Sequence, residues 1–118
     1  EALPSFSGPR PDRMLGTAGT VTTLAALDQG LPAYDSGKVH GYVITRDRIE
    51  RLLATLGAMP VAARASLPCL EPGRADLILA GVSICLAAMA AFRFRSMTVS
   101  DFGLREGILI ERLTALSP

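Results

Sequence analysis

Residues 13–27 read Arg-Met-Leu-Gly-Thr-Ala-Gly-Thr-Val-Thr-Thr-Leu-Ala-Ala-Leu, and this stretch gives the clearest indication of the fold class. Its first three residues form a short strand that leads into the turn at 16–20. A helix follows directly, because Val21, Leu24 and Leu27 form one apolar stripe at helical spacing. A strand, a glycine-containing turn and a helix in direct succession predict the α/β fold class.

The rest of the chain alternates helices with few, short strands. Strands are predicted at 39–44 and 96–100, and helices at 45–57, 60–66, 73–92 and 104–116. The clearest helix starts after Thr45, since Thr45 is a good N-cap and Ile49 and Leu56 belong to its apolar stripe. Residues 1–12 contain three prolines, so we expect an extended lead-in there. The sequence therefore predicts a helix-rich α/β layer.

The longest apolar run is Leu77 to Phe92, which is interrupted only by Ser83. A helix that crosses a bilayer needs about 20 apolar residues, and this run is shorter and rich in Ala and Gly. We therefore expect a helix buried on several sides and no membrane span. The predicted strands offer this helix few partners, so we expect part of a larger sheet to lie outside the chain.

Composition narrows the function classes. The chain has 118 residues, of which 49% are hydrophobic and 19% charged, so it fits one compact domain with a real core. Its net charge is +1, so the chain lacks the excess of basic residues that is typical of nucleic-acid-binding proteins. Cys69 and Cys85 are expected to be free thiols in a reducing, cytoplasmic setting, and a single histidine, His40, gives no basis for a zinc site. We expect a structural or surface role for His40.

The turn at 16–20 is the first candidate for chemistry. Gly16 and Gly19 would let backbone N–H groups approach an oxyanion, and the start of the following helix adds positive charge. Thr17 and Thr20 add hydroxyl donors. The same pattern also fits a tight turn followed by a threonine N-cap. It is neither a P-loop nor a dinucleotide fingerprint.

Two further segments place a cation beside glycine. Arg74 lies in Glu-Pro-Gly-Arg-Ala-Asp at 71–76, at the mouth of the long helix, where a bound phosphate or a carboxylate of Glu71 or Asp76 would offset its charge. Arg105 lies in Gly-Leu-Arg-Glu-Gly at 103–107, after a predicted strand. This second segment fits a ligand loop or a solvated helix start.

Four segments together resemble the exopolyphosphatase/guanosine pentaphosphate phosphatase (Ppx/GppA) family in order and spacing: residues 16–27, 39–42, 74–81 and 100–109. The resemblance covers nearly the whole chain. It implies an actin-like (ribonuclease H-like) fold, with residues 1–118 as a single fragment from the later part of the second lobe. It also implies a hydrolase that releases terminal phosphate from polyphosphate or guanosine pentaphosphate with a divalent metal, expected to be Mg²⁺.

The resemblance also assigns roles. Gly16, Thr17, Gly19, Thr20, Arg74 and Arg105 would bind phosphate or substrate along the cleft between the lobes. The family's aspartate-rich phosphate loop, its catalytic glutamate and the loop that opens the second lobe have no match here. We therefore expect no catalytic residue and no metal ligand in this chain, and little activity from it alone. Phe102 stands where the family pattern predicts a small residue.

The implied partners follow from the same reading. The substrate would be polyphosphate or guanosine pentaphosphate, an upstream lobe would complete the cleft, and a homodimer is expected; nucleic acid and membrane are not. The amino terminus has neither an initiator Met nor a signal peptide, so we expect a piece of a longer, cytoplasmic protein. The alternative is a stand-alone module that binds a nucleotide or polyanion, or that mediates oligomerisation, without catalysis.

Overall fold

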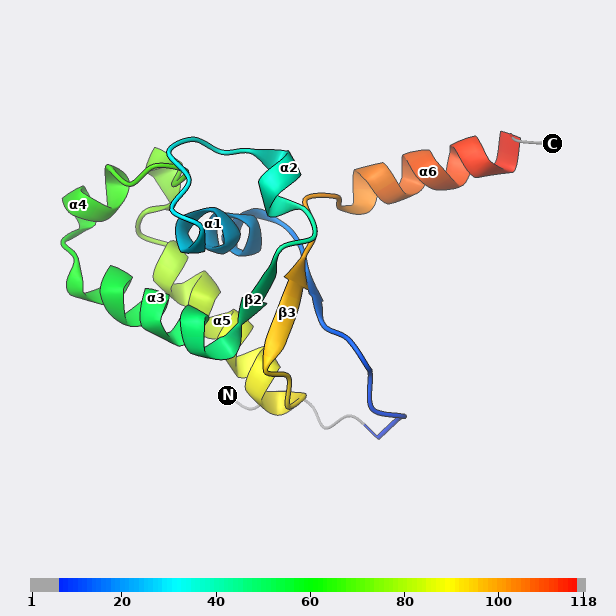
Figure 1. Ribbon diagram of the computed structural model, residues 1–118, viewed down its shortest axis with the longest axis horizontal. Helices are drawn as coiled ribbons and strands as arrows, with labels where there is room; N and C mark the ends of the chain where they lie inside the picture. The colour runs from blue at the N-terminus through cyan, green and yellow to red at the C-terminus, as the bar shows by residue number, and fades with distance from the viewer. Residues whose placement is uncertain (1–6, 117–118) are drawn as a thin grey trace.

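The computed structural model describes residues 7–116, which form a small sheet with helices packed on one face and a last helix that projects from the body (Figure 1). The elements in chain order are β1 Leu15–Gly16, α1 Gly19–Asp28, α2 Ser36–Val39, β2 Val43–Thr45, α3 Arg46–Ala58, α4 Val61–Ala65, the 3₁₀ turn η1 Pro72–Arg74, α5 Ile78–Ala91, β3 Ser96–Val99 and α6 Leu104–Leu116. This arrangement confirms the predicted helix-rich α/β class.

The sheet has the strand order β1-β3-β2, with β1 parallel and β2 antiparallel to the central strand β3. Thr98 of β3 lies between Leu15 and Val43, and the side chains of both these neighbours are exposed. Side chains alternate between the two faces of a strand. The residues that face the helices are buried: Gly16, Ile44, Met97 and Val99. The sheet is therefore covered on one face only.

Helix α3 forms as its sequence predicts. The hydroxyl oxygen of Thr45 accepts a hydrogen bond from the Arg48 N–H at 3.3 Å, which satisfies one of the free donors at the start of the helix. Ile49 and Leu56 are buried against the neighbouring elements. The amphipathic pattern and the N-cap prediction are both confirmed.

Three predicted boundaries are wrong. The first strand, predicted at 13–15, is Leu15–Gly16 and shares only Leu15 with the prediction. The strand predicted from residue 39 begins only at Val43, and α2 ends at Val39, because the Asp35 side chain accepts a hydrogen bond from the Gly37 N–H at 3.0 Å and caps a helical turn. The long helix begins at Ile78, several residues later than predicted, because the chain first makes the turn η1.

Helix α5 is not buried on several sides. It packs on α1 and α3, and only Ile78, Val82 and Met89 are buried. Leu77 and Ile84 are 66% and 69% exposed. A uniformly apolar helix needs packing partners on several sides, but this chain provides them on one side only. The prediction that the helix is buried on several sides is therefore wrong for this chain. No helix of the described residues is long and apolar enough to cross a membrane.

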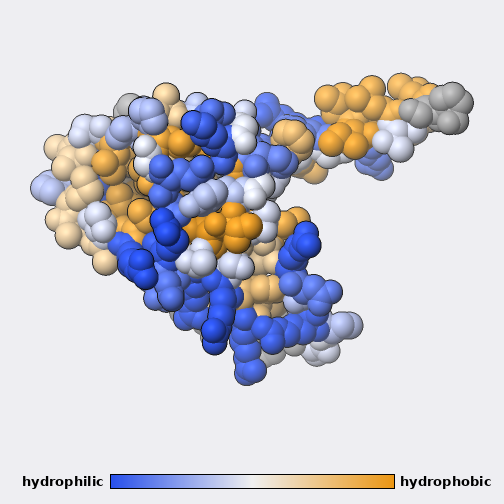
Figure 2. Space-filling model, in the orientation of Figure 1, coloured by the Kyte–Doolittle hydropathy of each residue, from blue (hydrophilic) through white to orange (hydrophobic). Residues whose placement is uncertain are grey.

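Helix α6 projects from the body after Gly103 (Figure 1), and apolar side chains cover much of its visible surface (Figure 2). None of its residues is buried. The exposed large side chains are Leu104, Ile108, Leu109, Ile110, Leu113 and Leu116. A contiguous apolar surface of this kind usually marks an interaction site.

A buried arginine joins α4 to the segment that precedes α5. Arg64 is only 7% exposed and donates hydrogen bonds to the carbonyl oxygens of Leu56 at 3.0 Å, Met59 at 3.1 Å and Ala75 at 3.2 Å. Two of these carbonyls lie at the end of α3, where the helix dipole favours a cation. Arg64 therefore fixes the backbone next to Arg74.

Candidate functional site

The turn between β1 and α1 presents an uncapped helix N-terminus. Ala18 precedes the helix with φ of 76° and ψ of −179°, a backbone region that is close to glycine-only, and it provides no side-chain cap. The first N–H groups of α1 have no acceptor within the helix. A strained residue beside open backbone donors fits an anion site.

Arg74 lies directly over this N-terminus. A β-carbon placed on Gly19 would be 1.7 Å from Nη1 of Arg74, so only glycine leaves room for the guanidinium. Nε of Arg74 pairs with the Glu71 carboxylate at 3.0 Å, and the Arg74 side chain is 50% exposed. Glu71 is one of the two carboxylates that the sequence offered as partners for Arg74, the other being Asp76. The Nη1 end of the guanidinium faces the start of α1, which itself carries partial positive charge. Two positive groups this close together are unfavourable unless an anion lies between them.

The start of α6 forms the opposite wall. The Thr17 hydroxyl donates to the carbonyl oxygen of Phe102 at 2.9 Å, and the Gly103 N–H donates to the Glu106 carboxylate at 2.8 Å. This second bond is half of a capping box and sets where α6 begins. A cavity of 400 Å³ lies between the two walls, lined by residues 17–19 and 103–106 together with Thr22 and Asp101.

The six predicted binding residues do not all share this cavity. Thr17, Gly19 and Arg105 line it, and the Arg105 side chain is 95% exposed at its edge. Arg74 and Thr20 line a smaller cavity of 290 Å³ that also contains Gly19. Thr20 packs on α5, and Gly16 is buried in β1 and lines neither cavity. The binding roles of all six residues stay predictions.

A third cavity, of 460 Å³, lies between α1 and the segment before α5. It adds Tyr34, Cys69 and Leu70 to Gly19 and Arg74, and none of the three was singled out from the sequence as a site residue. Tyr34 is the one aromatic residue in the loop after α1, which is the only local signal that could have found it.

Two aromatic residues brace the loop that leads into α6. Nδ1 of His40 accepts a hydrogen bond from the Asp101 N–H at 3.1 Å, and the His40 ring stacks on Phe102 with centroids 4.4 Å apart. The Tyr34 hydroxyl donates to the Asp101 carboxylate. Partial burial and then this bond raise the pKa of Tyr34 above its usual value. The structure thus gives His40 a specific partner in the expected structural role.

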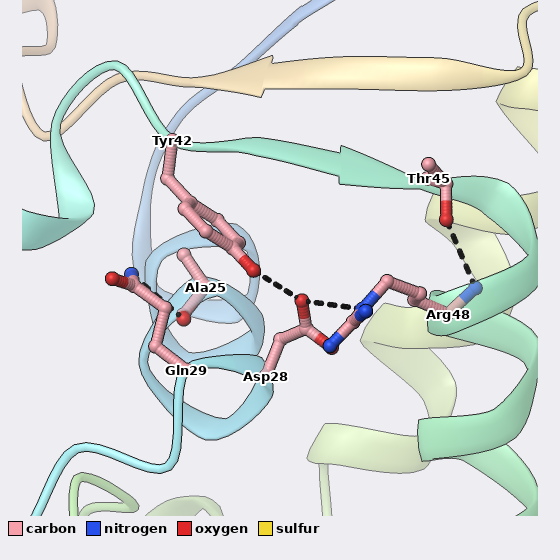
Figure 3. Close-up of polar contacts among 6 residues, drawn as sticks. All are labelled: Ala25, Asp28, Gln29, Tyr42, Thr45 and Arg48. Carbon is pink, nitrogen blue, oxygen red and sulfur yellow. Dashed lines mark hydrogen bonds and ion pairs between the residues drawn. The ribbon is translucent and has the colours of Figure 1, made fainter.

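The other end of α1 carries a closed polar network (Figure 3). Nε of Arg48 donates to both oxygens of the Asp28 carboxylate, at 2.8 and 2.9 Å, and the Tyr42 hydroxyl donates to Oδ2 at 2.5 Å. The Asp28 side chain is only 6% exposed. The hydrogen bond to Asp28, followed by burial, raises the pKa of Tyr42 above its usual value.

The donor set around Gly19 suits an anion and does not suit a metal ion. It consists of backbone N–H groups, threonine hydroxyls and guanidinium groups. Among the described residues no three His, Cys, Asp or Glu side chains converge. Cys69 and Cys85 are free, and burial raises the pKa of the Cys85 thiol. A phosphate group has the acceptor oxygens and the negative charge that such donors favour.

Comparison with known proteins identifies the family of the chain. A model of the Ppx/GppA phosphatase family matches residues 5–116. Exopolyphosphatase 2 of Mycobacterium tuberculosis (strain ATCC 25618 / H37Rv) is 33% identical over 100 residues, which cover 81% of this chain and 31% of that protein. Exopolyphosphatase 1 of Mycobacterium leprae (strain TN) is 28% identical over 104 residues, or 88% of this chain and 30% of that protein.

Solved structures share the fold. The crystal structure of the Aquifex aeolicus member of the Ppx/GppA family superposes with a TM-score of 0.84 at 39% identity, covering 91% of this chain and 36% of that one. An exopolyphosphatase from Cytophaga hutchinsonii shares the fold with a TM-score of 0.78 at 24% identity, covering 92% of this chain and 35% of that one. This chain spans about a third of the length of these relatives, and it belongs to the Ppx/GppA phosphatase family.

Proposed function

We propose that this chain forms one wall of the phosphate-binding cleft of an exopolyphosphatase-type hydrolase. The wall consists of the turn at 16–20, Arg74 and the start of α6. In this proposal the chain binds the polyanion and an upstream lobe supplies the groups that cleave it, so the chain alone releases little or no phosphate. Phosphoryl transfer depends on charge neutralisation from both sides of the transferred group, and this chain offers one side.

The observation that carries the proposal is the guanidinium of Arg74 over Gly19. Two positive features, a half-exposed cation and the N-terminus of α1, meet there without a side-chain cap. Glu71 offsets part of the charge of Arg74 through Nε only. A phosphate group would accept hydrogen bonds from the guanidinium and from the backbone at once, which is the usual way that helix N-termini bind anions.

The test is a calorimetric titration of the chain with tripolyphosphate. We expect saturable binding by the wild type and a loss of roughly tenfold or more in affinity for Arg74→Gln, because a charge-assisted hydrogen bond is removed. The matched control is Arg46→Gln in α3, which removes an equally charged, ion-paired arginine away from the site. Equal affinity for the two variants would contradict the proposal, since it would show that only overall charge matters.

We assign polyphosphate as the first substrate to test, because the curated relatives above are exopolyphosphatases. Guanosine pentaphosphate is the second, since the family description covers both enzyme types. Phosphate release from either compound by the chain alone would contradict the expected inactivity. In the whole protein a divalent cation, with Mg²⁺ the expected ion, would neutralise phosphate charge. The donors around Gly19 do not fit a metal ion, so in this proposal that site does not hold the cation.

A second candidate role is favoured by the apolar surface of α5 and α6. The exposed side chains of Leu77, just before α5, of Ile84 on α5, and of α6 are suited to contact with the upstream lobe or with a second copy. This is the oligomerisation alternative. Light scattering of the chain over a concentration series tests it: a dimer that Ile84→Asp disrupts would support a self-association surface. A monomer at all concentrations would exclude the homodimer.

A further inference from the structure

We propose that His40 is a positioning residue for the phosphate site, and that Phe102 is its partner. His40 holds the loop at residues 100–103, and the loop in turn holds the wall that carries Arg105 against the turn before α1. This inference rests on the proposed function, because the site is the one assigned there. His40 itself lines none of the three cavities described above.

The backbone of His40 is fixed at the end of the central strand. The next residue, Gly41, has a φ of 84° and donates its N–H to the carbonyl oxygen of Val99 at 2.7 Å. The Val99 N–H in turn donates to the carbonyl oxygen of Tyr42 at 2.8 Å. These two bonds set the position from which the His40 side chain reaches the loop after β3.

The side chain then makes two different contacts with consecutive residues. Nδ1 accepts from the Asp101 N–H at 3.1 Å, which requires Nδ1 to be unprotonated. The imidazole ring stacks on the ring of Phe102, with centroids 4.4 Å and planes 27° apart. An acceptor and a flat apolar face are both used, so the two contacts can be removed separately.

Phe102 connects this brace to the phosphate site. Its carbonyl oxygen accepts from the Thr17 hydroxyl at 2.9 Å, while its ring lies on His40. Thr17 belongs to the turn that presents the N-terminus of α1. The residue at 102 was expected to be small, and the stack gives a physical reason why phenylalanine stands there. A displacement of His40 would therefore move Phe102, and through Phe102 it would change the position of Thr17 in the turn.

Three variants separate the contacts. His40→Ala removes both. His40→Asn keeps an acceptor at the δ position and removes the ring, and Phe102→Leu keeps the acceptor and removes the stack. Tyr42→Phe is the control for a general loss of stability, since it deletes a hydrogen bond at the far end of α1.

Two measurements are made on the full chain: amide hydrogen exchange of Asp101, and affinity for tripolyphosphate. We expect His40→Ala to speed exchange and to lower affinity by roughly tenfold, from the combined worth of a hydrogen bond and an aromatic pair. His40→Asn should restore slow exchange and recover about half of that loss on a logarithmic scale. Phe102→Leu should lower affinity by about threefold, and Tyr42→Phe should change neither quantity.

The outcomes are distinct. Unchanged exchange in His40→Ala would overturn the inference, and so would faster exchange with unchanged affinity, because the loop would then move without effect on the site. If the wild type does not bind tripolyphosphate, the proposed function fails instead, and the role of His40 at this site fails with it. The exchange data would then still show whether His40 holds the loop.

Discussion

The two ends of helix α1 carry polar clusters that differ in how their charges are compensated. At the carboxyl end, the buried carboxylate of Asp28 accepts from Arg48 and from Tyr42, so the charge has an opposite partner. At the amino end, Arg74 lies over Gly19 at a helix start that has no side-chain cap. Ala18 adds backbone strain at that end and none is present around Asp28.

This difference separates a structural cluster from a candidate site. A buried ionic group whose partners are all within the fold holds segments together, here α1, α3 and the residue that precedes β2. At the amino end of α1, like charges lie next to each other and the backbone is strained, so the surrounding structure must hold this cluster in place. Adjacent like charges and backbone strain are common features of ligand-binding sites. Changes at the two ends should therefore affect different quantities.

The largest effect is expected from Asp28→Ala. It leaves the Tyr42 hydroxyl without its acceptor and Arg48 without its carboxylate, so we expect a loss of about 3 kcal/mol in the free energy of unfolding. Arg48 can still reach solvent, which keeps the loss at the low end for a broken buried pair. Urea denaturation measures it. The affinity of the folded protein for tripolyphosphate should stay the same, and a parallel loss of affinity would show that the two ends are not independent.

Gly19→Ala should give the opposite pattern. The new methyl group would displace the end of the Arg74 side chain, which is flexible, so the free energy of unfolding should change little. Affinity for tripolyphosphate should fall by about 2 kcal/mol, or roughly thirtyfold, because the guanidinium no longer reaches the anion. Calorimetry and urea denaturation of the same sample test this. Unchanged affinity would remove Arg74 from the site.

Ala18→Gly tests the strain at the amino end. Glycine adopts the observed φ of 76° readily, so relief of strain should outweigh the added entropy of the unfolded chain and raise the free energy of unfolding by about 1 kcal/mol. The control is Ala25→Gly inside α1, where the same change should destabilise by about 1 kcal/mol or more. Destabilisation in both variants would mean that Ala18 is not strained.

The smallest effect is a pH dependence at the carboxyl end. The pKa of Tyr42 is raised in the folded state, so its contribution to stability is full below the ordinary tyrosine pKa of about 10 and declines as pH rises above it. Stability measured from pH 9 to 11 should therefore fall with pH, and the slope should be smaller in Tyr42→Phe. Tyr34 also has a raised pKa, so part of the slope should remain. Identical slopes would contradict the assignment.

Local patterns in the sequence predicted most of the fold. The cap at Thr45 and the apolar stripe of α3 depend on residues a few positions apart, so both were predictable. The strand predicted from residue 39 was wrong because a side chain four residues earlier, Asp35, caps a helical turn that competes with it. The predicted burial of α5 on several sides was wrong. An apolar pattern shows that a helix needs packing partners, but it does not show that the chain contains them.

The site depended on contacts that no local pattern contains. Arg74 contacts Gly19, which lies 55 residues earlier in the chain. From the sequence, only the family resemblance could place these two residues together. His40 finds Asp101 across 61 residues, so a lone histidine gave no sign of its partner. The phosphate-binding roles of all six residues predicted from the sequence, Gly16 and Thr20 included, stay predictions.

The buried Arg64 has a consequence for how the site responds to its surroundings. Its bonds go to the neutral carbonyl oxygens of Leu56, Met59 and Ala75, and none of these acceptors is a carboxylate that acid would neutralise. Added salt screens exposed ion pairs strongly and buried contacts weakly. The backbone beside Arg74 is therefore anchored by contacts that neither acid nor salt readily loosens. The pairing of Arg74 with Glu71 is exposed, and in our proposal it gives way to a phosphate.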